Sequence, residues 1–305
     1  MTLVDNPSDA TVFAPSLPRT FDTHRAPLVL PEGKKLAVSV LLHAPSYQDV
    51  PPAGSFKPIT MQGGVGRETS EPKHGQVARL SQWDFGLTVG IWRLLGIAEK
   101  AGVPVAVALD SFGVRTMPGL ATLVAQRAQE IVVRGSAANI ILDDAMSSDD
   151  ERAYIAEARS AVEAATGRTA TGWFSPERAN TLRTPELVRE AGFDWFGDWP
   201  VDERPVKLDG AASGLIALPF GLETEDMFSL YTRSLAFPDY ERLLDETVEQ
   251  LIADADIVGG RFLGLSWFGW VLGQACFADV AERTLLKLAA NPQVLLLTPG
   301  QAAAL

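Results

Sequence analysis

The 305-residue sequence has only one cysteine, Cys276, and only three histidines. A single cysteine cannot form an internal disulfide bond, and this composition is typical of a reducing compartment, so we expect a cytoplasmic protein. No CxxC pair or paired His and Cys spacing occurs, which excludes the common structural zinc motifs. The N-terminus lacks a basic segment followed by an apolar one, so we expect no signal peptide.

Long hydrophobic runs and an excess of positive charge are also missing. No stretch of about eighteen apolar residues occurs, so we expect no membrane-spanning segment. The chain has 26 Lys and Arg against 38 Asp and Glu, a net charge of −12, which argues against nucleic-acid and anionic-membrane partners. No GxSxG, P-loop, GxGxxG or HExxH pattern stands in a strand–turn–helix context. The absence of these motifs argues against nucleotide binding and serine hydrolysis. We expect a small-molecule substrate and a homo-oligomer, with a paralogous subunit as the alternative protein partner.

What the sequence does contain is a regular alternation of strands and helices. Hydrophobic residues make up 47% of the chain and charged residues 21%, as in soluble globular proteins. Strand and helix alternate about seven times, which predicts an α/β fold with a parallel sheet and a barrel-like closure. The predicted strands are 36–42, 103–109, 131–133, 173–174, 215–220, 262–266 and 294–297.

The helices and the domain limits follow from the same pattern. A Ser148-x-x-Glu151 capping box is predicted to open a helix over 149–165, and Asp239 to cap a helix that runs to about residue 255. Residues 1–33 are polar and proline-rich, which predicts an N-terminal arm, and 34–305 are predicted to form one barrel domain. Residues 44–82 are rich in Pro and Gly and are predicted to be a long loop covering the site.

The stretch 130–139 holds the most informative charged residue. Arg134 directly follows the apolar run Ile131–Val133, and the carboxyl ends of parallel strands are where ligands bind in α/β folds. Arg134 is therefore predicted to line a pocket. The alternative is a structural ion pair with Asp143 or Asp144.

Other polar and aromatic residues also stand at predicted strand ends. We assign catalytic roles to His43, Arg134 and Glu177, because burial and neighbouring charges can tune such groups for acid–base work. The alternatives are a structural histidine and a solvated Glu177–Arg178 pair. The substrate-binding residues are predicted to be Asp110, Asp198, Glu223, Trp267, Phe268 and Trp270, although the aromatic residues could equally belong to the core.

Ten short segments, in a fixed order along the chain, match a known family. They are Arg79–Gly86, Val89–Leu95, Ala101–Pro104, Thr166–Arg168, Gly172–Pro176, Glu190–Asp194, Asp198–Pro200, Leu218–Phe220, Asp226–Met227 and Gly264–Ser266. These segments resemble the polysaccharide deacetylase-like superfamily (the carbohydrate esterase type), and most closely its allantoinase-like branch, which opens small cyclic amides. The resemblance runs from about Leu36 to the C-terminus and implies a distorted (β/α) barrel of about seven parallel strands with the site at the strand ends.

The chain departs from this family at three positions that hold or border a divalent metal in the relatives. An acidic residue is expected shortly after His43, where this chain has Pro45. Histidines are expected at the positions of Arg134 and Phe268. Proline and phenylalanine offer no ligand, and a guanidinium repels a cation. We therefore predict no metal and no cofactor.

Two functions remain open. One is a metal-independent hydrolase of a small cyclic amide, imide or lactone, in which Arg134 orients a carboxylate or polarises a carbonyl and His43 or Glu177 activates water. The other is a catalytically silent homologue that acts as a ligand-binding or partner subunit.

Overall fold

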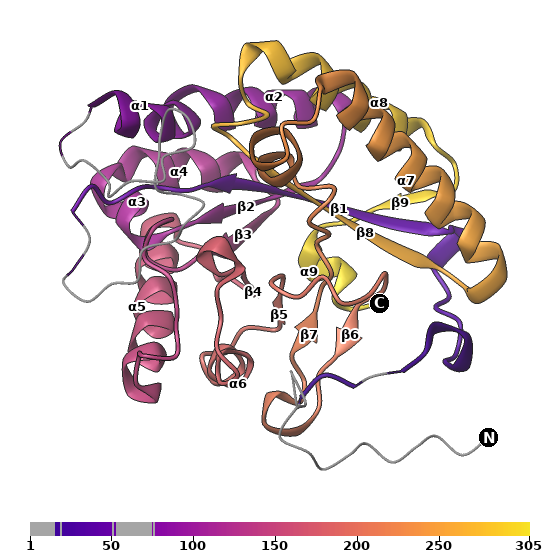
Figure 1. Ribbon diagram of the computed structural model, residues 1–305, viewed down its shortest axis with the longest axis horizontal. Coiled ribbons are helices and arrows are strands. Elements are labelled where there is room, and N and C mark those ends of the chain that lie inside the picture. The colour runs from indigo at the N-terminus through magenta and orange to yellow at the C-terminus, as the bar shows by residue number, and fades with distance from the viewer. Residues whose placement is uncertain (1–15, 19, 51, 53–74, 76) are drawn as a thin grey trace.

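The computed structural model describes residues 16–18, 20–50, 52, 75 and 77–305 of the chain. Its centre is a curled sheet with helices packed along the outer side (Figure 1). The strands are β1 Leu36–Ala44, β2 Val105–Leu109, β3 Glu130–Val133, β4 Gly172–Trp173, β5 Trp195–Phe196, β6 Val206–Lys207, β7 Ile216–Ala217, β8 Arg261–Phe268 and β9 Val294–Leu296. The helices are α1 Val77–Phe85, α2 Ile91–Ala101, α3 Ser111–Thr116, α4 Pro118–Arg127, α5 Ser148–Thr166, α6 Thr184–Glu190, α7 Phe237–Val258, α8 Ala278–Ala290 and α9 Pro299–Ala302. Among the described residues, no helix is long and apolar enough to cross a membrane.

The sheet runs in the order β6-β7-β5-β4-β3-β2-β1-β8, and only the β6–β7 pair is antiparallel. Strand β8 pairs with residues 36–43 and so occupies one side of β1. Strands β2 and β9 share the other side, where β2 pairs with Val40–Ala44 and β9 pairs with Leu36–Val38. A single parallel bridge between Phe220 and Gly264 of β8 brings the two ends of the curl together. Seven parallel strands, β1 to β5, β7 and β8, thus form the wall, which confirms the predicted distorted barrel.

Strand β1 is almost wholly apolar because both of its faces are buried. Val38 and Val40 pack in the layer between the sheet and the helices, whereas Ala37 and Leu41 pack inside the barrel. Successive side chains of a strand point to opposite faces, so His43 also points inward. The mouth of the barrel is therefore lined by alternate residues of each strand end.

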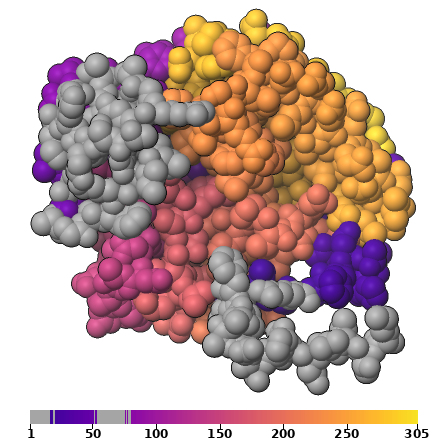
Figure 2. All heavy atoms as spheres, in the orientation of Figure 1, coloured from indigo at the N-terminus to yellow at the C-terminus, as the bar shows by residue number. Residues whose placement is uncertain are grey.

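The N-terminal arm is described from residue 16, and residues 20–33 lie against the end of the barrel where the strands begin. Asp22 pairs with Arg261, the first residue of β8, at 2.6 Å and with Arg25 at 2.9 Å. The Gly260 amide donates a hydrogen bond of 2.7 Å to the Leu28 carbonyl. Figure 2 shows this segment, in indigo, against the part of the molecule that holds the end of α7.

The predicted capping box of α5 does not form. Ser147, one residue earlier, is the N-cap, and its hydroxyl accepts a hydrogen bond of 3.1 Å from the Asp150 amide. Glu151 is fully buried and instead accepts hydrogen bonds from the hydroxyl of Thr181 at 3.0 and 3.2 Å. The Glu151 side chain, which the capping-box pattern placed at the start of the helix, is thus bound to Thr181 instead.

Two further boundaries differ from the prediction. Helix α1 begins at Val77, inside the range predicted as loop, and residues 53–74 lie outside the described residues, so the covering role remains a prediction. Helix α7 begins at Phe237, after the N-cap Ala236. Asp239 therefore lies in the first turn, where a carboxylate favours the helix dipole without capping it.

Candidate functional site

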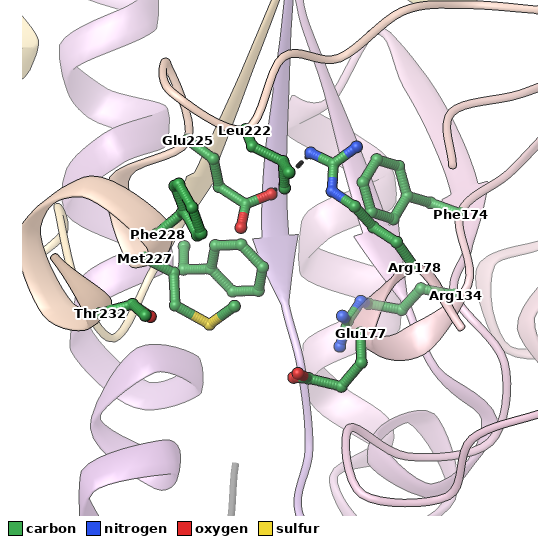
Figure 3. Close-up of a pocket in the computed structure, with 10 residues that line it drawn as sticks. Arg134, Phe174, Glu177, Arg178, Leu222, Glu225, Met227, Phe228 and Thr232 are labelled. Carbon is green, nitrogen blue, oxygen red and sulfur yellow. Dashed lines mark hydrogen bonds and ion pairs between the residues drawn. The ribbon is translucent and has the colours of Figure 1, made fainter. Parts of the chain in front are cut away.

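A cavity of about 170 Å³ lies at the mouth of the barrel, where the strands end. A cavity on the order of 150 Å³ holds one benzene ring, so this one has room for a small single-ring molecule. Its walls come from the segments after β3, β4 and β7 and from the end of β8 (Figure 3). The lining residues are Arg134, Phe174, Glu177, Arg178, Leu222, Glu225, Met227, Phe228, Thr232 and Phe268.

Arg134 follows β3 and reaches the cavity although it is only 1% exposed. Its Nε and Nη1 atoms are buried and have no hydrogen-bond partner among the residues that the structure describes. The centre of its guanidinium group lies 5.7 Å from the centroid of the Phe268 ring. Burial lowers the pKa of Arg134 from its usual range, and the charges of Asp110 and Glu177 oppose that shift.

The alternative that Arg134 pairs with Asp143 or Asp144 is wrong. The Asp143 carboxylate accepts a hydrogen bond of 2.7 Å from the Ala145 amide. Among the described residues, no carboxylate lies within 4.0 Å of the Arg134 guanidinium. Burying an unpaired cation is costly, so this arrangement is typical of a binding site that holds its charge for a ligand.

Gly135 makes the sharp turn that places Arg134. Its φ of 72° lies in the left-handed region that glycine adopts without strain. A Cβ at this position would lie 2.3 Å from the Tyr154 hydroxyl and 3.0 Å from the Pro176 ring. The same hydroxyl, which comes from α5, accepts a hydrogen bond of 2.9 Å from the Ser136 amide. The turn is thus held from both sides.

Arg178 is the second cation of the cavity, and its charge is paired. Its Nη2 lies 2.7 Å from the Glu225 carboxylate, and its Nη1 donates to the Phe220 carbonyl at 2.9 Å. The guanidinium also lies over the Phe174 ring, 4.8 Å from its centroid. The alternative of a solvated Glu177–Arg178 pair is therefore wrong, because the partner of Arg178 is a buried acid from the segment after β7.

Glu177 lines the cavity from a strained turn. Glu177 and Arg178 have φ values of 56° and 54°, and a non-glycine residue in this region costs on the order of 1–3 kcal/mol. The turn is anchored by Asp198, whose carboxylate accepts hydrogen bonds of 2.7 Å from both the amide and the hydroxyl of Ser175. Such strain clusters at functional sites, where the surrounding structure enforces it.

His43 lies behind the wall of the cavity. Its ring stacks on Phe268, with the centroids 4.4 Å apart, and meets the edge of Phe174 at 4.7 Å. Its Nε2 lies 2.8 Å from the Ser266 hydroxyl, which in turn donates to Glu225 at 3.2 Å. Burial, followed by the charges of the two nearby arginines, holds the pKa of His43 well below its usual range. The ring is thus neutral and enclosed, which does not fit the predicted role in activating water.

The three acids predicted to bind substrate do not line the cavity. Asp110 is the N-cap of α3 and accepts hydrogen bonds from Ser46 and Gly113. Asp198 holds the turn before Glu177, as described above. Glu223 is exposed and pairs with Arg233 at 3.0 Å. The first two acids are structural, and the third lies on the surface.

The three predicted aromatic residues fall in three different places. Phe268 lines the cavity. Trp267 belongs to the core on the outer face of the sheet, where its indole donates to the Tyr240 hydroxyl at 3.0 Å. The alternation along β8 therefore puts Trp267 on the wrong face for its predicted role. Trp270 packs against Trp83 at the rim, with centroids 4.8 Å apart.

The sequence prediction missed most of the wall that follows β7. Glu225, Met227 and Phe228 line the cavity from this segment, which includes the π-helix Met227–Thr232. A π-helical turn has no sequence pattern of its own, but it is frequent at functional sites. The one available signal was the acidic cluster at 223–226, from which Glu223 was chosen in place of Glu225.

The residues present do not fit the divalent metal that the resemblance implies. His43 is enclosed by two aromatic rings, and the position next to it in space is occupied by the Phe268 ring. Arg134 brings a positive charge to the same mouth. Among the described residues, no three His, Cys, Asp or Glu side chains gather closely enough to hold a metal ion. No catalytic step is therefore derived through a metal.

Solved structures of the same fold confirm the resemblance at the level of the fold. The Puue allantoinase aligns over 99% of this chain and 97% of its own, with a TM-score of 0.77 and 18% identity. A Mycobacterium smegmatis protein assigned as a polysaccharide deacetylase aligns over 92% and 93%, with a TM-score of 0.75 and 19% identity. A mutant of a CE4 family pseudoenzyme aligns over 91% and 71%, with a TM-score of 0.50 and 11% identity.

The chain thus has the polysaccharide deacetylase-like barrel fold. No protein-family model matches the sequence, and no curated protein matches it. At the identities of the solved structures the likeness defines the fold alone, and one fold carries many functions, which depend on the residues of the site.

Proposed function

We propose that the protein hydrolyses a small cyclic amide, imide or lactone without a metal ion. The observation that carries the proposal is the guanidinium of Arg134 in the wall of a cavity of single-ring size, which Glu177 also lines. Within the described part of the chain, the Nε and Nη1 atoms of this guanidinium have no hydrogen-bond partner. A fixed cation in a water-poor site stabilises negative charge that develops during a reaction. A carboxylate in the same cavity can accept a proton from water.

In the proposed reaction, Arg134 donates hydrogen bonds to the carbonyl oxygen of the substrate. Glu177 accepts a proton from a water molecule whose oxygen attacks the carbonyl carbon. The negative charge that develops on the carbonyl oxygen is stabilised by Arg134. The C–N or C–O bond of the ring then breaks, and the proton passes from Glu177 to the leaving nitrogen or oxygen. The attacked carbon becomes a carboxyl group, which releases its own proton to solvent at neutral pH.

His43 has a positioning role in this proposal. Because the Ser266 hydroxyl donates to Glu225, the His43 Nε2 atom carries the proton that bonds to Ser266. The hydrogen bonds from His43 to Ser266 and from Ser266 to Glu225 orient the Glu225 carboxylate. Glu225 in turn fixes Arg178 beside Glu177. The base is therefore Glu177, since His43 is enclosed behind Phe174 and Phe268.

A catalytically silent ligand-binding homologue is the second candidate. The observation in its favour is that Phe268 and Arg134 stand at positions of the mouth where the resemblance implies histidines. These two positions therefore offer no histidine ligand for the metal that the resemblance implies. One solved structure of this fold is itself described as a pseudoenzyme. The cavity and Arg134 serve a binding protein as well as an enzyme.

A matched pair of variants tests the proposal. Small cyclic amides, imides and lactones are incubated with the protein in a chelator, and ring opening is followed. We expect turnover by the wild type, a loss of about 10²–10⁴-fold in kcat for Glu177→Gln, and no change for Glu223→Gln, since Glu223 is exposed and outside the cavity. Equal turnover by Glu177→Gln, or activity that the chelator removes and added metal restores, contradicts the proposal. Absence of turnover across the panel favours the silent homologue.

A further inference from the structure

Two arginines line the same cavity, and they differ in whether an acidic side chain pairs with the guanidinium group. Arg178 has Glu225 at 2.7 Å. Arg134 is more deeply buried, yet its Nε and Nη1 have no partner. The acids whose charges act on it include Asp110, which is engaged by Ser46 and Gly113, and Glu177 across the cavity wall.

The cavity around Arg134 otherwise suits a small flat molecule. Phe174 lies on one side of it in Figure 3, and Met227 and Phe228 lie on the other. Phe268 also lines the cavity. A guanidinium presents planar pairs of N–H groups that match the two oxygens of a carboxylate. Largely apolar walls with a few fixed polar or charged groups are the usual design of a small-molecule site.

We propose that this cavity is a carboxylate site, in which Arg134 binds the carboxylate of a small ring-sized or ring-opened molecule. The inference deepens the proposed function and rests on it for one point, the source of the ligand. Hydrolysis adds the oxygen of water to the carbonyl carbon and breaks the ring bond, and the carboxyl group that results loses its proton at neutral pH. The neutral substrate thus becomes an anion on Arg134, so the product binds more tightly than the substrate.

Benzoate and benzamide provide a matched pair of probes, because they share shape and differ in charge. Titration calorimetry with the wild type is expected to give at least about tenfold tighter binding of benzoate, the scale of a charged hydrogen bond. The preference is expected to vanish in Arg134→Met. It is expected to persist in Arg233→Met, which removes the same charge from an exposed arginine outside the cavity.

A second variant keeps the test independent of how well Arg134→Met folds. Glu177→Gln removes a negative charge from the cavity and is expected to tighten benzoate binding several-fold while leaving benzamide binding unchanged. Equal binding of the two probes to the wild type overturns the carboxylate site, and so does a preference that survives Arg134→Met. If benzoate is preferred but no ring is opened, the proposed hydrolysis fails while the carboxylate site stands. If rings are opened but benzoate is not preferred, the carboxylate site fails while the proposed hydrolysis stands.

Discussion

Among the described residues, three buried acids that follow strands have their hydrogen bonds satisfied, whereas the buried cation Arg134 does not. Asp110, Asp198 and Asp226 each accept at least two hydrogen bonds from backbone amides or hydroxyl groups. They fix the turns that follow the strands. Arg134 lacks any such support for its Nε and Nη1 atoms. The difference separates structural charges from the charge that we assign to ligand binding.

Asp198 gives a test of the structural group. Burial raises its pKa from 3.8 to about 6, although the hydrogen bonds from Ser175 oppose the shift. The folded protein therefore keeps a proton between pH 3.8 and 6 that the unfolded chain has released, so this residue lowers the free energy of unfolding as pH rises through that window. The test is urea unfolding of the wild type and of Asp198→Asn at several pH values. The free energy of unfolding of the wild type minus that of the variant should fall by up to about 3 kcal/mol as pH rises, and level off above pH 6. A difference that is constant or rises with pH contradicts the assignment.

The location of a residue at the cavity could be predicted from the sequence only where its position at a strand end decided it. Arg134, Glu177 and Phe268 stand at strand ends and line the cavity. Trp267 and Phe268 are adjacent but face opposite sides, and a period of two counted from the inward Gly264 and Ser266 would have separated them. Position along the chain could not show that Asp198 supports a turn, because its partner Ser175 is 23 residues away.

At the scale of elements, the end of β8 is held in place by a close crossing with a helix. The π-helix Gly86–Gly90 leads into α2 and passes the turn after β8 with backbone in contact with backbone. A Cβ on Gly90 would lie 1.9 Å from the Gly269 carbonyl oxygen. Gly269 follows Phe268 and donates to the His43 carbonyl at 3.0 Å. The crossing therefore positions one wall of the cavity.

Gly90→Ala tests this crossing. Since neither backbone can move away easily, we expect the free energy of unfolding in urea to fall by about 3 kcal/mol or more. The control is Gly96→Ala in α2, the helix that directly follows, where the added Cβ meets only Arg127 Nη2 at 3.8 Å. Helix propensity predicts a gain of up to about 1 kcal/mol for this change. Similar stabilities for the two variants would show that the crossing is not tight.

Helices α2, α4 and α8 were predictable because their apolar residues recur at helical spacing and because Gly102 and Pro118 mark boundaries. The short helix α3 could not be predicted in this way, since it is defined by the Asp110 cap and not by periodicity. The capping box of α5 was predicted from a local sequence pattern but does not form. The Glu151 side chain is buried and bonds to Thr181 in place of the helix N-terminus.

At the scale of the whole molecule, the barrel was predictable because its strands are buried on both faces. Continuous apolar runs separated by helices leave few alternatives to a parallel sheet closed on itself. The incomplete closure at the Phe220–Gly264 bridge depends on side-chain packing within the barrel. Whether the site contains a cavity could not be predicted either, since a cavity depends on how large residues from distant segments meet.

The central claim is that Arg134 is kept unpaired for a ligand, and the thermal stability of the ligand-free protein tests it most directly. Removing a buried charge that has no partner is expected to stabilise the fold, so Arg134→Met should melt at the temperature of the wild type or above it. A guanidinium that neutralises a buried acid would behave differently, because its loss costs about 3–5 kcal/mol. For a domain of this size that corresponds to a melting temperature lower by roughly 6 °C or more. Such a decrease would contradict the account.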